Sequence, residues 1–193
     1  MKTMKDLVES MQNIIVEGEV GKFYHGSTHK IGSFVDEFVG QGNNQLGPGI
    51  YFSTDVHDAL AYSGKDGFIY EVSINLRNDL NTTQKVNPRV CKALMMNTPD
   101  ESAWTNWDEN KNIAIKMALQ NTLEISDNML DALMTIWGDW YMQDEVMFVR
   151  ELAKLGFDGS IYPNYNNSGS TWAVVYNPQS ITINKIHNPT DFK

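Results

Sequence analysis

The feature that most constrains the fold of this chain is a change in the spacing of its apolar residues. Apolar and polar residues alternate over 68–76, which predicts a half-buried strand. Between 88 and 155 the apolar residues recur at the three- and four-residue intervals of amphipathic helices. Strand-like runs return from about 156 onward. Strands at both ends with helices between them predict an α+β fold.

The remaining elements follow from shorter patterns. Residues 3–17 carry apolar side chains at helical spacing and predict an amphipathic helix that packs on the core. Residues 22–25 predict a strand that ends at Gly26, and a glycine-dotted loop follows it. A short helix is expected over 55–62, beginning at a Ser53 or Thr54 cap and ending at Gly64. Four further strands are predicted over 50–52, 160–162, 172–176 and 181–183, with Gly156 ending the last helix and Asn177-Pro178 forming a turn.

Length and charge exclude several classes of protein. The 193 residues are enough for one domain with a core of its own. The chain has 24 acidic and 15 basic residues and a formal net charge of -9, so its overall field repels polyanions. Generic nucleic-acid binding is therefore not expected. The single cysteine, Cys91, has no partner for an internal disulfide or a structural zinc site.

The chain carries no signal for membrane insertion or export. Apolar runs are short, and none approaches the roughly 18–20 residues that a membrane-spanning helix needs. Acidic residues interrupt the first 19 residues where a signal peptide requires an apolar core. We therefore expect a cytoplasmic protein with no membrane partner.

Three short motifs stand out for their aromatic or histidine residues, and the first two also contain glycine. The first is Tyr24-His25-Gly26-Ser27, at the end of a predicted strand. The second is Gly47-Pro48-Gly49-Ile50-Tyr51-Phe52-Ser53, which leads into the short helix that carries Tyr62. The third is the late strand that begins near Trp172.

Together these motifs resemble the diphtheria-toxin-like, His-Tyr-Glu type of ADP-ribosyltransferase, the group that includes poly(ADP-ribose) polymerases. The resemblance implies one ADP-ribosyltransferase-like domain over 1–193 with a split β-sheet core, formed by 22–76 and 156–186. An N-terminal helix and a helical insertion over 88–155 complete the expected domain. NAD is the implied substrate, and no metal is expected. The resemblance makes His25 and Tyr51 catalytic and predicts an NAD-binding set of His25, Gly26, Ser27, Gly49, Tyr51, Phe52 and Tyr62.

The chemistry of NAD fits these residue types. While it is attached to ribose, nicotinamide is a flat and cationic ring, so aromatic faces bind it by stacking and by cation–π attraction. Tyr51 and Tyr62 are expected to form two walls of such a slot. Gly26 lets a carboxamide approach the backbone closely. By resemblance, His25 bonds the adenosine-side ribose, Gly26 holds the nicotinamide amide, and Ser27 assists.

The sequence departs from the family at its catalytic glutamate. Trp172 stands at the place of that glutamate, and a shift of one residue puts Thr171 there. The loop 164–170 before it carries no acid. Asp158, Glu151 or an asparagine of this loop remain as replacements, although Glu151 is also explained as a solvated helix charge. Ala59 stands where the polymerases have a serine that helps to hold nicotinamide.

Other residues have simpler interpretations. The three remaining histidines lack the spacing of a metal site or a catalytic triad and are interpreted as surface residues: His29, His57 and His187. The tryptophans of the helical region are interpreted as packing residues, with a partner-binding face as the alternative: Trp104, Trp107, Trp137 and Trp140.

The leading functional hypothesis is an NAD-dependent mono-ADP-ribosyltransferase that modifies a protein target. Similar compact transferases are bacterial toxins and phage proteins, so the setting would be an effector in the host cytoplasm, with the helical insertion recognising the target. Polymer synthesis is not expected because it depends on the missing glutamate. Two alternatives stay open: an inactive NAD- or ADP-ribose-binding or inhibitory module, and a protein-interaction unit with no ligand.

Overall fold

A computed structural model describes residues 21–35, 46–98, 111–141 and 144–192. The helix expected over 3–17 and most of the glycine-dotted loop lie outside these residues, as do Trp104 and Trp107. The described strands are β1 (Phe23–Ser27), β2 (Ile50–Ser53), β3 (Phe68–Ile74), β4 (Asp79–Asn81), β5 (Gly159–Tyr162), β6 (Trp172–Val175) and β7 (Ile181–His187). The described α-helices are α2 (Val56–Ser63), α3 (Pro88–Met96), α4 (Lys111–Ile125), α5 (Met129–Trp140) and α6 (Glu145–Lys154).

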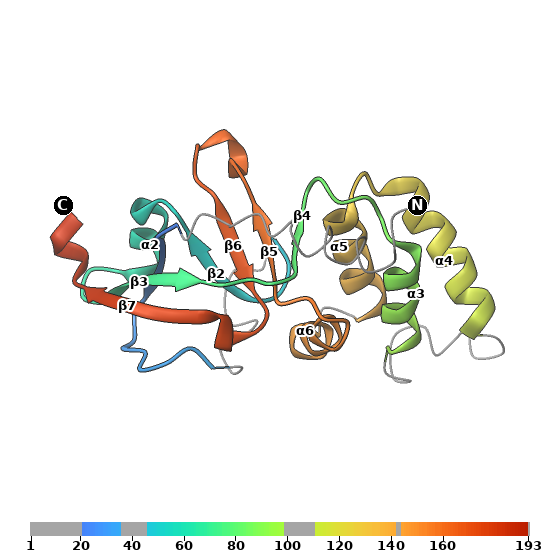
Figure 1. Cartoon of the computed structure of the whole chain (residues 1–193), viewed down its shortest axis with the longest axis horizontal. Coiled ribbons are helices and arrows are strands. Elements are labelled where there is room, and N and C mark those ends of the chain that lie inside the picture. Colours follow the sequence, from blue (N-terminus) through green and yellow to red (C-terminus); the bar gives the residue numbers. More distant parts are fainter. Residues whose placement is uncertain (1–20, 36–45, 99–110, 142–143, 193) are drawn as a thin grey trace, which may run out of the picture.

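The strands form a mixed sheet in the order β4-β5-β6-β2-β1-β3-β7. All neighbours are antiparallel except β4 and β5. Figure 1 shows the sheet and α2 in one half of the molecule and α3, α4 and α5 in the other, with α6 near the junction. The α+β fold expected from the sequence is thus confirmed.

The centre of the sheet is nearly split. Strands β1 and β2 are paired at Tyr24 and Ser53 alone, whereas β1 and β3 are paired along the full length of β1. The half formed by β4, β5, β6 and β2 therefore meets the half formed by β1, β3 and β7 at one residue pair. This narrow junction leaves room for a cavity between the two halves.

The local expectations at β1 and α2 need correction. Gly26 does not end the first strand, because β1 continues to Ser27 with Gly26 paired to Ile69. Neither Ser53 nor Thr54 caps α2; the cap is Asp55, whose carboxylate accepts a hydrogen bond from the His57 backbone N–H. The reason is that Ser53 is still part of β2. Helix α2 ends at Gly64 as expected.

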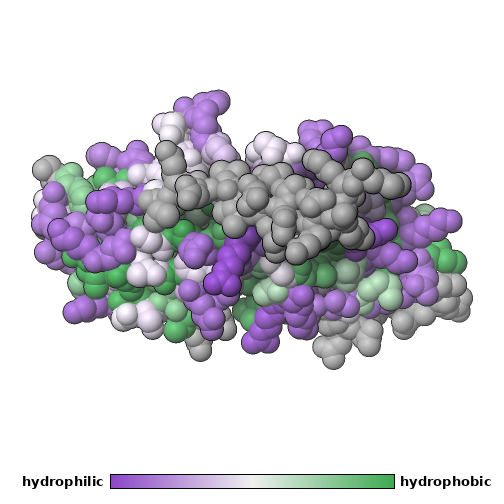
Figure 2. Space-filling model, in the orientation of Figure 1, coloured by the Kyte–Doolittle hydropathy of each residue, from purple (hydrophilic) through white to green (hydrophobic). Residues whose placement is uncertain are grey.

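The helical half contains most of the buried aromatic residues outside the sheet. Trp137 and Trp140 are buried on α5, which confirms their interpretation as packing residues. Helix α6 is followed by Gly156 at φ 90°, a left-handed conformation that glycine adopts without strain. On α4, however, Ile113 and Met117 are exposed although they follow the helical apolar spacing. Figure 2 shows hydrophobic residues among hydrophilic ones at the α4 end of the molecule.

Candidate active site

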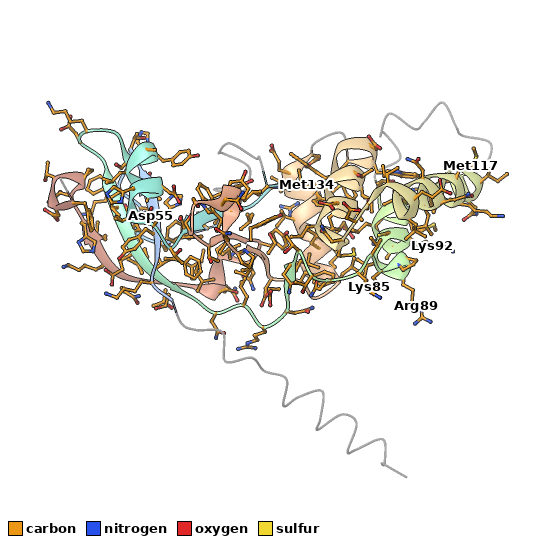
Figure 3. All side chains as sticks on the ribbon, turned by 90° about the horizontal axis from the view of Figure 1, so that it is seen from above. Asp55, Lys85, Arg89, Lys92, Met117 and Met134 are labelled. Carbon is orange, nitrogen blue, oxygen red and sulfur yellow. The ribbon has the colours of Figure 1, made fainter. Side chains whose placement is uncertain are left out.

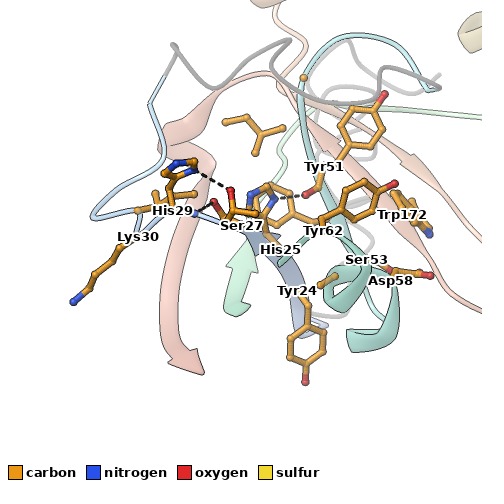
Figure 4. A pocket seen from close by; sticks show the side chains of 17 residues that line it. Tyr24, His25, Ser27, His29, Lys30, Tyr51, Ser53, Asp58, Tyr62 and Trp172 are labelled. Atoms are coloured by element: carbon orange, nitrogen blue, oxygen red, sulfur yellow. Dashed lines mark hydrogen bonds between the residues drawn. The ribbon is translucent and has the colours of Figure 1, made fainter. Parts of the chain in front are cut away.

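A cavity opens where β1 and β2 separate. Beyond the single pair of Tyr24 and Ser53, the edge of β1 over 25–27 is not paired with β2. The cavity has a volume of about 450 Å³ and is lined by β1, the loop after it, β2, α2 and Trp172. Figure 4 shows these side chains converging from separate elements. All seven sequence-predicted binding residues line it: His25, Gly26, Ser27, Gly49, Tyr51, Phe52 and Tyr62.

His25 connects the two strands after their ladder has ended. Its ring Nδ1 lies 2.8 Å from the backbone carbonyl oxygen of Tyr51. Because a carbonyl only accepts hydrogen bonds, Nδ1 must carry the proton. Burial lowers the pKa of His25, and the hydrogen bond to Tyr51 opposes this shift only in part. The ring is therefore neutral near pH 7, and its Nε2 is a hydrogen-bond acceptor.

Aromatic rings hold the His25 imidazole in place. The ring of Phe34 contacts it edge-on at 5.2 Å between centroids, and Phe52 lies 5.4 Å away. Both phenylalanines are buried and also contact each other. Packing against two buried rings restricts the rotamers of His25. Phe52 therefore supports the histidine, besides lining the cavity.

The hydroxyl of the Tyr51 side chain is held by two hydrogen bonds. Its hydroxyl accepts a hydrogen bond of 2.9 Å from the Leu46 N–H and donates one to the carbonyl oxygen of Gly47. Burial raises the pKa of this hydroxyl, so it stays protonated at any physiological pH. The Tyr51 ring contacts Trp172 edge-on at 6.2 Å. It thus forms a fixed aromatic wall of the cavity.

Tyr62 provides a second aromatic surface of the same cavity. It lies on α2 and lines the cavity while remaining 51% exposed. A large aromatic side chain that is exposed at a cavity is available to stack on a flat ligand. The structure thus brings Tyr51 and Tyr62, from a strand and the helix that follows it, to one cavity.

Two glycines are required here by close packing. A Cβ on Gly26 would lie 1.8 Å from the Ala59 carbonyl oxygen, because α2 crosses directly over β1. A Cβ on Gly49 would lie 2.4 Å from a methyl carbon of Val174 on β6. Ala59 itself is buried and lines the cavity. The Gly26 position is therefore constrained by the fold as well as by any ligand.

One end of the cavity carries polar and cationic groups. Ser27 accepts a hydrogen bond of 3.1 Å from the His29 N–H, and the His29 ring lies 2.9 Å from the Thr28 hydroxyl. Lys30 follows and also lines the cavity, with its side chain exposed. The sequence-based interpretation gave Lys30 no role and placed His29 simply on the surface. An ammonium group at the mouth of a cavity attracts phosphate groups.

The structure removes the two acids that were considered as replacements for the missing glutamate. Both carboxylate oxygens of Asp158 accept backbone hydrogen bonds, from Arg77 and Asn78, at the end of β6 remote from Trp172. Glu151 is buried rather than solvated, and it pairs with Lys154 on its own helix. Neither lines the cavity.

The cavity does contain a carboxylate that sequence reasoning missed. Asp58 lines it from the first turn of α2, and its Oδ2 accepts a hydrogen bond of 2.5 Å from the Ser53 hydroxyl. The sequence explained this acid as a favourable charge at a helix N-terminus. The sequence did contain a signal for this position of Asp58. A strand that leads directly into a short helix places the first turn of the helix beside the end of the strand.

Two of the other histidines, His57 and His187, each lie close to an acid. His57 pairs with Asp55, and the half-buried His187 lies 3.3 Å from Glu71, which corrects its placement on the surface. Within the part of the chain that the structure describes, no group of three or more acidic, histidine or cysteine residues is arranged to hold a metal ion. None of the described helices is both long and apolar enough to cross a membrane.

Comparison with known proteins assigns the chain to a family. None of the curated proteins matches the chain significantly. A solved structure titled "Crystal structure of an anti-CRISPR protein" is similar over 88% of this chain and 98% of its own, with 15% identity and a TM-score of 0.34, and a similarity of that size supports no conclusion. A family model described as "ADP-Ribosyltransferase in polyvalent proteins" matches residues 16–189, nearly the whole chain, and the chain therefore belongs to this ADP-ribosyltransferase family.

Proposed function

We propose that the protein is an NAD-dependent mono-ADP-ribosyltransferase that modifies a protein and releases nicotinamide. ADP-ribosyltransferases use NAD as their substrate. The observation that carries the proposal is the cavity between β1 and β2, which His25, Tyr51 and Tyr62 line together. Its volume of about 450 Å³ lies in the range of small-molecule sites.

The residues of the cavity fit the parts of NAD in a consistent order. The cationic nicotinamide ring stacks between Tyr51 and Tyr62. Its carboxamide bonds to the backbone of Gly26, on the strand edge that β2 leaves unpaired. The neutral His25 ring accepts a hydrogen bond at Nε2 from a hydroxyl of the adenosine-side ribose. Lys30 attracts the pyrophosphate at the polar end of the cavity.

This assignment makes the protein a variant of the diphtheria-toxin-like type. The motifs occur in the order of that type, and all their proposed ligand-binding residues line one cavity. Trp172 lies at the cavity where that type has its glutamate. Polymer elongation depends on the glutamate, so transfer of a single ADP-ribose is favoured.

Incubation of the purified protein with NAD labelled in the adenylate moiety, with and without a bacterial lysate, tests the proposal. We expect release of free nicotinamide and labelling of protein bands. His25→Ala is expected to abolish both. His57→Ala is the matched control, because His57 is exposed on α2 and does not line the cavity. A wild-type protein that neither releases nicotinamide nor labels protein would show that the proposed catalysis is wrong.

A second candidate function is NAD binding without turnover, as in an inhibitory module. The observation that favours it is the presence of Trp172 in place of the expected carboxylate. Saturable NAD binding by calorimetry that is lost in Tyr51→Ala, with no nicotinamide release from the wild type, would support this function. A pure protein-interaction unit predicts no stabilisation by NAD in a thermal-shift assay.

We propose that the helical half recognises the target. No acid occurs between Asp79 and Asp100, and this stretch exposes Lys85, Arg89 and Lys92 (Figure 3). These cations form a local basic surface on an acidic protein, which complements an acidic region of a partner. The expected setting is the cytoplasm of a bacterial host, where the protein acts as a phage or bacterial effector.

The double variant Arg89→Glu/Lys92→Glu tests recognition separately from catalysis. Both side chains are exposed, so the fold should be retained. We expect labelling of the lysate protein to fall while nicotinamide release with water as acceptor stays at the wild-type rate. Lys65→Glu, on the sheet half, is the matched control. Unchanged labelling in the double variant would contradict this part of the proposal.

A further inference from the structure

ADP-ribosyl transfer needs an anion beside the ribose from which nicotinamide departs. As the bond from C1′ to the nicotinamide nitrogen breaks, positive charge develops on the ribose. A fixed negative charge near it stabilises the transition state more than the ground state. The indole of Trp172 carries no charge, and Asp158 and Glu151 are engaged elsewhere. We therefore expect a transferase of this geometry to use a carboxylate from another element.

Asp58 is next to the place where the carboxylate is missing. Trp172 on β6 is paired with Ser53 on β2, and the Ser53 hydroxyl donates to Asp58 Oδ2 at 2.5 Å. Trp172, Ser53 and Asp58 all line the cavity. Figure 4 shows the three together on one side of it, away from His29 and Lys30.

The Ser53 side chain fixes the direction of the carboxylate. Ser53 is buried, and its Oγ accepts a hydrogen bond of 3.0 Å from the Asp55 N–H while it donates to Asp58. A hydroxyl oxygen that accepts a hydrogen bond from a backbone N–H directs its own proton toward a different acceptor. Ser53 is thus a positioning residue that aims its proton at Oδ2 and orders the carboxylate of Asp58.

We propose that Asp58, on α2, is a catalytic residue that takes over the electrostatic role of the glutamate absent from β6. The inference rests on the proposed transferase function. In the bound complex, Asp58 Oδ1 accepts a hydrogen bond from a hydroxyl of the nicotinamide-side ribose. The negative charge of Asp58 then faces the ribose ring from α2 rather than from β6.

The reaction is balanced without any further reactant. The C1′–N bond breaks heterolytically, and its electron pair goes to the nicotinamide nitrogen, which neutralises the pyridinium charge. The ribose becomes an oxocarbenium ion that Asp58 stabilises. A nucleophilic group of the target, or water, then forms a new bond to C1′ and releases its proton to solvent. The products are ADP-ribosylated target, nicotinamide and one proton.

The test compares Asp58→Asn with Asp66→Asn in nicotinamide release and in NAD-induced thermal stabilisation. Asparagine keeps the size of Asp58 and an acceptor for Ser53 but removes the charge. Because removing one such electrostatic group costs about 10²–10³ in kcat, we expect about a 100-fold lower kcat in Asp58→Asn with its NAD-induced stabilisation retained. Asp66 is exposed and does not line the cavity, so Asp66→Asn should behave as wild type.

Two further variants separate a catalytic role from a structural one. Asp58→Glu restores the charge and should recover part of the activity lost in Asp58→Asn. Ser53→Ala should lower kcat with little change in KM, because the proposal gives Ser53 the ordering of the carboxylate and no contact with NAD. If the wild type turns over NAD and the kcat of Asp58→Asn is close to the wild-type value, the proposed role of Asp58 is wrong. Loss of NAD-induced stabilisation in Asp58→Asn would also overturn it. A wild-type protein without turnover would instead overturn the proposed function itself.

Discussion

The Nδ1 atom of His25 and the backbone carbonyl oxygen of Tyr51 are joined by a hydrogen bond of 2.8 Å across the opening between β1 and β2. The two strands share only the pair of Tyr24 and Ser53, so this bond provides a second connection between the halves of the sheet. It also fixes the tautomer of His25 and leaves Nε2 as a hydrogen-bond acceptor. One side chain therefore both joins the split sheet and lines the cavity.

Stability is expected to fall as the pH drops below 6.5, because burial lowers the pKa of His25 from that ordinary value. Above pH 6.5 the ring is neutral in both the folded and the unfolded chain, so its contribution to the free energy of unfolding is fully present. Below 6.5 the unfolded chain binds the proton more readily, and the contribution is lost until the lower folded pKa is reached. Urea denaturation of the wild type and His25→Gln between pH 7.5 and 5 measures this effect. The prediction is contradicted if the free energy of unfolding changes equally with pH in the two proteins.

Tyr62→Ala is expected to weaken NAD binding without unfolding the protein. The side chain is 51% exposed, so its removal takes little from the core. Loss of the stacking and cation–π contact with nicotinamide, together about 1–2 kcal/mol, corresponds to roughly 5- to 30-fold weaker binding. Calorimetry with NAD measures the change. Tyr62→Phe retains the ring and serves as the control, so an equal loss in that variant would exclude stacking as the cause.

Lys30→Met should weaken NAD binding in a salt-dependent way. The exposed ammonium group lies at the cavity, where we propose that it attracts the pyrophosphate of NAD. Salt screens such exposed charges, so the difference between wild type and variant should shrink as the salt concentration rises from about 0.05 to 0.5 M. Nicotinamide alone should bind both proteins equally. Lys65→Met is the matched control at an exposed site that does not line the cavity.

Gly26→Ala is expected to destabilise the fold even without ligand. The added Cβ would lie 1.8 Å from the backbone oxygen of Ala59, so α2 must move away from β1. Overpacking of this kind costs about 1–3 kcal/mol or more. Gly138→Ala is the control, because an added Cβ there meets no atom within 4 Å and alanine favours the α5 helix. Urea denaturation should show a clear loss for Gly26→Ala and no loss for Gly138→Ala.

Local patterning was sufficient to predict most of the strands and the helical character of the middle of the chain. The alternation over 68–76 predicted β3, and the apolar spacing over 88–155 predicted a helical region, which the structure divides into α3, α4, α5 and α6. The strand β4 was missed because only three residues form it, too few for a period to be recognised. The cap of α2 was placed too early because the pairing of Ser53 with Trp172, 119 residues away along the chain, keeps Ser53 in β2.

The roles of the charged residues were predicted least well, because these roles depend on neighbours that are distant in the sequence. Glu151 has a helical neighbour in Lys154, which suggested a solvated charge. The side chain is nevertheless buried, and Asn97, the residue after α3, donates a hydrogen bond to it. Asp58 had a sufficient local explanation as an acid at a helix N-terminus. Nothing within the local sequence shows that Trp172 on β6 is brought beside it.

The sequence by itself therefore determined the α+β class, because that depends on local spacing, and its motifs predicted seven of the residues that line the cavity. The tertiary structure alone decided that β1 and β2 share a single pair, that the gap between them becomes the cavity, and that the one described carboxylate lining it belongs to α2. Such features arise from pairing and packing between segments far apart in the chain, and no local pattern encodes them.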